Sequence, residues 1–232
     1  MSPLFFLFFG MQQAFADAYT VVLDPGHGGS ETGAIGVTGL QESDFVLDLA
    51  LRTKEKLSRE DITVILTRNS DDDRSLNDRA ELANELNADL FISIHANAAP
   101  VSSLSGIETY SVDVASDAAA KQVASRENAS SAFLMSTFGY GNLLLSLEFS
   151  EMVQRNMITD LKKQYPVEDI VNLGHKTAMF SVLVKTKMPA ILFEAGFLSN
   201  PEEERQLRTA HYRDAMAQAL ADSIIEWAER GK

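Results

Sequence analysis

The sequence contains no cysteine among its 232 residues. This excludes disulfide bonds, thiolate zinc sites, iron–sulfur clusters and catalytic cysteine nucleophiles. Histidine is also scarce, with four in the whole chain. Any metal site must therefore be built from a few histidines together with aspartate and glutamate side chains.

Basic side chains are in the minority, because 20 lysines and arginines stand against 33 aspartates and glutamates, for a formal net charge of −13. Proteins that bind nucleic acids carry a basic surface that displaces counterions from the phosphates, so this balance argues against that class. Hydrophobic residues make up 45% of the chain and charged residues 23%, as in ordinary globular proteins. We therefore expect one folded domain with a substantial core.

Long apolar stretches are absent as well, and no segment approaches the ~20 apolar residues that a transmembrane helix needs. A short apolar run at residues 4–9 is followed by Ala14-Phe15-Ala16, a pattern typical of a signal-peptide cleavage site. No lysine or arginine precedes the run, which leaves a buried N-terminal strand or a misassigned start codon as alternatives. We expect residues 1–16 to be a signal peptide and the protein to be periplasmic or otherwise extracytoplasmic.

Short apolar runs alternate with amphipathic helical patterns along the chain. The runs are bounded by turn or polar residues, as buried strands are, and the helical patterns repeat apolar residues every three or four positions. The predicted strands are 20–23, 62–66, 90–94, 107–110 and 190–193, and the predicted helices are 43–58, 76–86 and 201–227. This alternation predicts a single α/β domain over residues 17–232, with a mostly parallel sheet flanked by helices.

The segment at residues 113–165 breaks this rhythm. It has two helical stretches, 115–126 and 143–163, with a glycine-containing loop at 138–142 between them and no clear strand. One interpretation is a helical crossover that packs on the sheet, and the other is an insertion that covers a site. We expect a helical crossover that contains an insertion, and such an insertion could be regulatory.

Polar residues follow the carboxyl ends of three predicted strands. His27 lies in a glycine-rich loop after the first strand, His95 follows the strand at 90–94, and Glu194 follows the last strand. Glu42 opens the first helix, near the loop that begins at His27. Open parallel sheets bind ligands at the carboxyl ends of their strands, so we expect these four side chains to converge.

Two histidines and two glutamates at such positions favour a hydrolytic zinc site. A single histidine at a strand end is more often a hydrogen-bonded loop residue than a ligand, so the combination carries the inference. Two imidazoles and one carboxylate can bind Zn²⁺ and leave the fourth position open to water. A second carboxylate outside the coordination sphere can take the proton of that water.

Four parts of the sequence match the motifs of one enzyme family. They are VVLDPGHGG at residues 21–29, Glu42, SIHAN at 93–97 and FEAGFLSN at 193–200. Arg68, Asp78-Arg79 and residues 106–110 fit the same pattern. Together they resemble the zinc-dependent N-acetylmuramoyl-L-alanine amidases of the type-3 family. The resemblance runs from Thr20 to about Trp227.

This resemblance implies a single domain with a twisted sheet of about six strands and a zinc ion bound by His27, Glu42 and His95. It implies that Glu194 is the catalytic carboxylate, the general base that takes a proton from zinc-activated water and passes it to the departing alanine nitrogen. The reaction would be hydrolysis of the amide between the lactyl group of N-acetylmuramic acid and the L-alanine of peptidoglycan stem peptides.

Cell-division members of this family carry an inserted helix that blocks the zinc site until an activator protein displaces it. Residues 120–128 resemble the run that precedes that insertion. Glu148 and Glu151 are candidates for a blocking carboxylate on a helix within residues 130–165. The alternative for each is a solvated surface glutamate.

The expected partners follow from charge and from the resemblance. We expect peptidoglycan as the substrate, an activator protein as a partner and a monomeric chain. Because the chain ends at Lys232 directly after the last predicted helix, no appended wall-binding domain is expected. A net charge of −13 offers no attraction to an anionic wall polymer, which favours recruitment by a protein partner.

Two rival functions stay open at the level of sequence. A zinc peptidase or deacetylase acting on a different amide would use identical metal chemistry. A catalytically silent wall-binding module would keep the fold without turnover, although the presence of both histidines and both glutamates argues against it.

Other polar residues are less informative. His175 could line a substrate groove, but an ordinary surface or edge-strand histidine is the better interpretation, and His211 is expected to be solvated. Residues 71–73 form an acidic turn, because three consecutive aspartates lack the alternating ligand spacing of a calcium loop. Asn97, beside His95, could orient the site or the glycan.

Overall fold

The computed structural model describes residues 18–58, 61–128, 140–166 and 169–230. Within these ranges one sheet of six strands runs in the order β2-β1-β3-β6-β4-β5. Its strands are β1 (Tyr19–Pro25), β2 (Ile62–Leu66), β3 (Leu90–Asn97), β4 (Ile107–Ser111), β5 (Asn172–Thr177) and β6 (Ala190–Phe197).

Five neighbouring pairs make up this sheet, and β4 with β6 is the antiparallel one. The connection from β3 to β4 covers residues 98–106 and contains no helix. A parallel return needs a crossover of a dozen or more residues, so the short connection reverses the chain direction. The predicted α/β fold with a mostly parallel sheet of about six strands is confirmed.

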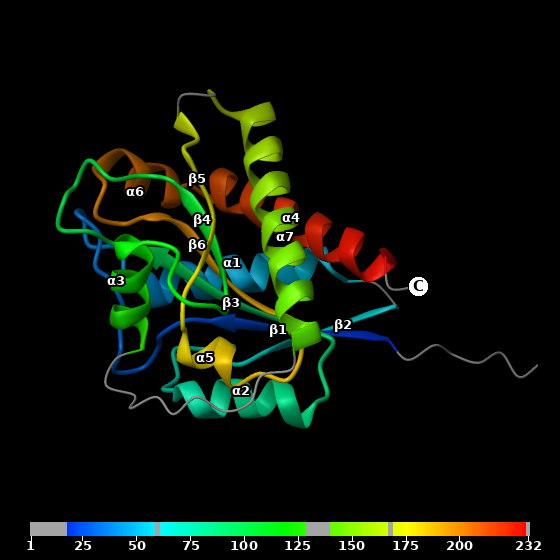
Figure 1. The fold of residues 1–232 in the computed structure, drawn as a ribbon. Coiled ribbons are helices and arrows are strands. Elements are labelled where there is room, and N and C mark those ends of the chain that lie inside the picture. The colour runs from blue at the N-terminus through cyan, green and yellow to red at the C-terminus, as the bar shows by residue number, and fades with distance from the viewer. Residues whose placement is uncertain (1–17, 59–60, 129–139, 167–168, 231–232) are drawn as a thin grey trace, which may run out of the picture.

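Helices cover both faces of the sheet (Figure 1). Side chains alternate along a strand, so Val21 and Leu23 of β1 enter one core while Val22 enters the other. The first core is completed by α1 (Glu42–Lys56), α4 (Tyr140–Gln164) and α7 (Ala210–Arg230), and the second by α2 (Leu76–Glu85), α3 (Ala118–Glu127) and α5 (Ser181–Val184). The short helix α6 (Pro201–Leu207) follows β6.

Side-chain caps fix where several helices begin. The Ser75 hydroxyl accepts the N–H of Asp78 at 3.2 Å at the start of α2. The Asn200 side chain accepts the N–H groups of Glu202 and Glu203 at the start of α6, where Pro201 is the first helical residue. Such caps satisfy amide groups that the helix itself leaves without partners. Both caps confirm the predicted helix starts.

The segment at residues 113–165 contains α3 and α4, as its helical patterns predict. Helix α4 begins at Tyr140, inside the loop expected at 138–142. The expected signal peptide at 1–16 lies outside the described residues. Among the helices that the structure describes, each is too short or too polar to cross a bilayer.

Candidate metal centre

His27 lies in the loop after β1, and two buried arginines fix the backbone of that loop. Arg68 donates from Nε to the carbonyl of Pro25 at 3.0 Å and from Nη2 to that of Gly26 at 2.8 Å. Arg79 donates to the carbonyls of Pro25 and His27, both at 2.6 Å. These bonds hold His27 at a φ of 57°, in the left-handed region that non-glycine residues seldom adopt.

The predicted acidic turn at residues 71–73 holds the next part of the same loop. Asp71 accepts the N–H of Gly29 at 2.8 Å, and Asp73 accepts both the N–H and the hydroxyl of Ser30, at 2.8 and 2.7 Å. The turn is thus an anchor for the His27 loop, which agrees with its interpretation as an acidic turn.

Glu42 and His95 meet where α1 begins and β3 ends. The Glu42 carboxylate accepts the N–H of Ala34 at 2.8 Å and that of Ala96 at 3.0 Å. His95 is 6% exposed, and its Nδ1 lies 3.0 Å from Oε1 of Glu42. Backbone amides therefore aim this carboxylate at the imidazole.

Two glycines make the close approach of these side chains possible. A Cβ atom at Gly26 would lie 2.4 Å from the His95 ring. At Gly33, where φ is +66°, a Cβ atom would lie 2.5 Å from a Glu42 oxygen and 2.6 Å from the His27 ring. Any larger residue at either position would push the ligands apart.

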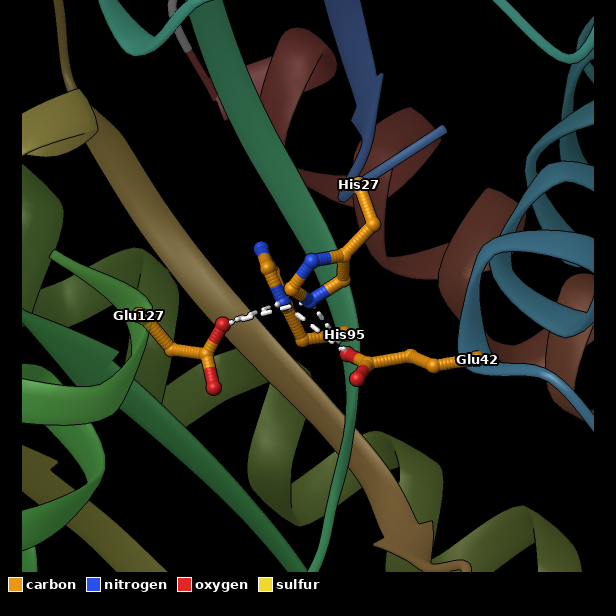
Figure 2. Close-up of side chains that lie close together, drawn as sticks. All are labelled: His27, Glu42, His95 and Glu127. Atoms are coloured by element: carbon orange, nitrogen blue, oxygen red, sulfur yellow. Dashed lines mark hydrogen bonds and ion pairs between the residues drawn. The ribbon is translucent and has the colours of Figure 1, made fainter. Parts of the chain in front are cut away.

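A fourth side chain, Glu127, reaches the same point from the last residue of α3. Its Oε2 lies 3.3 Å from Nε2 of His27 and 3.2 Å from Nδ1 of His95. Figure 2 shows the two carboxylates entering from opposite sides, with the two imidazoles between them. The sequence did not single out Glu127 as a site residue, although it lies in the family-like run at 120–128.

Four of the six distances between the ligand atoms match the separation of neighbouring ligands around zinc. The ligand atoms lie within 4.8 Å of one another, and the four His–Glu distances are 3.0 to 3.3 Å. Neighbouring ligand atoms are about 3.3 Å apart around zinc with bonds of ~2.0–2.1 Å. Nε2 of His27 and Oε2 of Glu127 are buried without a hydrogen bond to any described residue. Two imidazoles and two carboxylates in this geometry fit Zn²⁺.

The charges in the cluster compensate one another. Burial opposes the charged form of His27, but Glu127 and Glu42 outweigh it and raise the pKa of His27 to about 9. The same carboxylates hold the pKa of His95 well above its usual range, against the effect of burial. Burial likewise disfavours the Glu42 carboxylate, and the two imidazoles outweigh it and lower its pKa to about 2. In the metal-free protein the carboxylates are therefore ionised and the imidazoles protonated, and binding of a metal ion would release the imidazole protons.

Glu194 lies beside this cluster and has a different environment. Its backbone pairs with that of His95 in the β3–β6 register, and its side chain is 1% exposed. Oε2 of Glu194 has no hydrogen bond to a described residue. Burial, reinforced by the negative charge of Glu127, raises the pKa of Glu194 well above its usual range. A carboxylate with a raised pKa is a stronger proton acceptor than an ordinary one.

Polar side chains on both sides of Glu127 fasten the end of α3. Arg126 donates to the carbonyl of Ala98 and, at 2.7 Å, to the side chain of Asn97. Asn128 donates to the carbonyl of Met179 and accepts the N–H of Ser181, both at 2.7 Å. Asn97, expected to orient the site, thus contacts the segment that carries Glu127.

The two candidate blocking residues lie elsewhere. Glu148 and Glu151 are exposed on α4, outside the cluster that the described residues form. Helix α4 buries Phe149 and Met152 in the first core, whereas His95 points to the opposite face of the sheet because its neighbour Ile94 enters that core. Among the described residues, the additional carboxylate in this cluster comes from Glu127 of α3.

The remaining histidines are away from the cluster. His175 lies on the edge strand β5, in agreement with the favoured interpretation, and its Nε2 lies 3.0 Å from the Ser111 hydroxyl. His211 is exposed near the start of α7, where its ring packs against Tyr165.

Comparison with known proteins shows which family this chain resembles in sequence and in fold. The family model described as N-acetylmuramoyl-L-alanine amidase matches residues 21–226. The N-acetylmuramoyl-L-alanine amidase AmiA of Escherichia coli K12 is 36% identical over 217 residues, covering 89% of this chain and 75% of AmiA.

Solved structures have the same fold. An N-acetylmuramoyl-L-alanine amidase from Clostridium difficile 630 superimposes with a TM-score of 0.75 at 31% identity, covering 94% of this chain and 100% of that one. The catalytic domain of the amidase CwlV from Bacillus (Paenibacillus) polymyxa gives 0.72 at 29% identity, covering 90% and 98%. With the sequence blocks, the sheet topology and the family match in agreement, the chain belongs to the N-acetylmuramoyl-L-alanine amidase family of enzymes.

Proposed function

We propose that this amidase is zinc-dependent and cleaves the bond between N-acetylmuramic acid and the L-alanine of the peptidoglycan stem peptide. The observation that carries the proposal is the set of four ligand atoms from His27, Glu42, His95 and Glu127, beside the buried carboxyl group of Glu194. Their number, chemistry and spacing suit zinc.

Three residues, His27, Glu42 and His95, hold the ion in this proposal. Bound zinc supplies Lewis-acid polarisation of a carbonyl and lowers the pKa of water from ~15.7 toward ~7. Glu194 takes the proton of the attacking water at its free Oε2 and delivers it to the alanine nitrogen as the C–N bond breaks. Its raised pKa suits both steps, because the carboxyl group must gain a proton and then lose it.

Glu127 makes the described conformation an inhibited one in this proposal. Hydrolytic zinc sites use three protein ligands and keep a fourth position for water, whereas sites with four protein ligands are closed. With Glu127 present the set has four ligand atoms. Turnover then requires the end of α3 to leave, and an activator protein that binds α3 or its surroundings would shift this equilibrium.

The proposal includes export and a monomeric enzyme. Peptidoglycan lies outside the cytoplasm, and residues 1–16 have the pattern of a signal peptide. One chain contributes the complete set of ligand atoms and Glu194, so catalysis needs no residue from a second copy.

Mass analysis of muropeptides tests the proposal. Purified sacculi are digested with the zinc-loaded chain, with and without a chelator, and with an activator or the Glu127→Ala variant to relieve inhibition. We expect free stem peptides and peptide-free glycan, and their loss in chelator. Cleavage at another bond, or undiminished cleavage in chelator, would contradict the proposal.

A further inference from the structure

The cavity beside the metal centre has four basic side chains in its wall against three acidic ones, Asp24, Glu31 and Glu127, in a chain whose net charge is −13. Its volume is about 730 Å³, and its wall includes His27, His95 and Glu127. The basic side chains in the same wall are Arg74, Arg79, Arg126 and Lys185.

Two of these four basic groups have carboxylate partners within the protein. Arg79 pairs with Asp24 at 2.8 Å, and both are buried. Arg126 lies 3.3 Å from the second oxygen of Glu127. These two guanidiniums hold the loop after β1 and the end of α3. Their positive charges are neutralised by the carboxylates of Asp24 and Glu127.

Arg74 and Lys185 form no ion pair with any residue in the described part of the chain. The amino group of Lys185 donates to the side-chain oxygen of Asn77, which is neutral. Arg74 directly follows the acidic turn at 71–73, but those carboxylates accept hydrogen bonds from the His27 loop and from Ser70. Arg74 itself lines the cavity.

The backbone of Arg74 is fixed although its side chain is exposed. Its carbonyl accepts a hydrogen bond from Nε of Arg79 at 3.0 Å, and Arg79 in turn holds the carbonyl of His27. The same guanidinium therefore ties Arg74 and the metal-binding loop together. A ligand group bound by Arg74 would be positioned relative to the metal centre.

We propose that Arg74, assisted by Lys185, binds a free carboxylate of the second or third residue of the stem peptide, so that the enzyme prefers peptides with free carboxylates there to amidated ones. This inference rests on the proposed function. A guanidinium binds a carboxylate through two parallel charged hydrogen bonds, whereas a carboxamide has no charge and one acceptor oxygen. The sugar hydroxyl groups of the glycan are neutral, so the peptide side of the scissile amide is the source of the anion.

Defined disaccharide tetrapeptides test the preference in three forms. One has free carboxylates, one is amidated at the α-carboxyl of the second residue, and one at the side-chain carboxyl of the diamino-acid third residue. With the zinc-loaded Glu127→Ala chain we expect one amidated form to have a KM about tenfold above that of the free form, with kcat unchanged. Tenfold corresponds to one charge-assisted hydrogen-bonded pair. The form that responds identifies the carboxylate.

Substitution of the arginine must then remove this discrimination. Arg74→Gln raises KM for the free form about tenfold and leaves the responsive amidated form within about twofold, while Arg74→Lys retains part of the preference. The matched control is Arg155→Gln, which removes an exposed arginine of α4. Equal KM values for all three substrates, or an equal loss on all three in Arg74→Gln, would overturn the inference.

Binding separates this inference from the proposed reaction. The affinities of the three peptides are measured by calorimetry on Glu127→Ala with Glu194→Gln, with and without Arg74→Gln. A preference for the free form that depends on Arg74 supports the inference even if no hydrolysis occurs. Hydrolysis of all three forms at one efficiency contradicts the inference and leaves the proposed function intact.

Discussion

Glu194 is buried and Glu127 is partly buried beside it, and their surroundings shift their pKa values in opposite directions. Burial raises the pKa of Glu194, and the nearby charge of Glu127 raises it further. For Glu127 the opposing effect of burial is outweighed by His95 and His27, which lower its pKa well below the usual range. Carboxyl groups whose pKa values are pushed apart suit different tasks. This difference supports the proposed roles of Glu127 as a ligand and of Glu194 in proton transfer.

Replacing Glu194 tests this division of roles. Glu194→Gln should keep its zinc and lose at least ~100-fold in kcat, the usual scale of general acid–base catalysis. Zinc content is measured by atomic absorption and turnover by release of stem peptide. Glu151→Gln, at an exposed site on α4, is the control and should retain both. A Glu194→Gln enzyme of near-normal rate would remove this residue from the mechanism.

Helix α3 is lightly packed for an element that reaches an active site. Its buried apolar side chains are the small residues Ala120, Val123 and Ala124. Helix α4, by contrast, buries Phe149 and several other large side chains in the first core. Since hydrophobic stabilisation grows with buried apolar area, α3 can leave the sheet at lower cost than α4. This difference fits a displaceable helix.

Arg126 offers a test of that displacement without changing a ligand. Arg126→Gln removes the bonds to Ala98 and Asn97, and the loss of charged hydrogen bonds should raise basal turnover about tenfold. In a Glu127→Ala background the same change should add little, because the inhibiting contact is already gone. Lys121→Gln, on the exposed face of α3, serves as the control. Unchanged basal turnover in Arg126→Gln, or an equal gain in both backgrounds, would argue against α3 as the inhibitory element.

At the scale of the whole molecule, much of the site could be predicted because strand ends are visible in a sequence. His27, His95 and Glu194 each follow an apolar run. The structure brings them together at the carboxyl ends of the neighbouring strands β1, β3 and β6. Glu127 could not be found in this way, since a helix end reaches the site only through tertiary packing. The signal for it was its place between Arg126 and Asn128 in a family-like run, a pair that the structure shows as anchors.

The position of Glu148 and Glu151, exposed on α4 and outside the described cluster, has a related cause. Their helix was predicted, with its apolar stripe, but periodicity does not say which face of the sheet a helix covers. The antiparallel course of β4 follows from the short connection after β3, a signal that the sequence contains and that the strand and helix patterns alone do not use. The local hydrophobic pattern thus predicts where helices and strands lie in the sequence. The face of the sheet that each helix covers depends on tertiary packing.

Glu203 links a buried carboxyl group to the stability of the whole molecule. It accepts the N–H groups of Gly106 and Phe197, yet burial outweighs these bonds and raises its pKa to about 7. Between pH 4.5 and 7 the unfolded chain has lost this proton and the folded chain has kept it. The free energy of unfolding therefore falls as the pH rises through this window, by on the order of 3 kcal/mol from this group.

Glu203→Gln should remove that contribution. The variant loses a hydrogen-bond acceptor at every pH, but its stability relative to the original chain should increase from pH 4.5 to pH 7.5. Urea unfolding of both chains in chelator gives the difference without a contribution from metal binding. A difference between the two chains that is the same at both pH values would contradict the raised pKa of Glu203.

The central claim is that one zinc ion binds among His27, Glu42, His95 and Glu127. Diffraction from crystals of the zinc-loaded chain, recorded on both sides of the zinc absorption edge, tests it directly. The account predicts one anomalous peak among these four side chains, and its loss in His95→Ala. A bound zinc that lies elsewhere, or a peak of equal strength in His95→Ala, would contradict it.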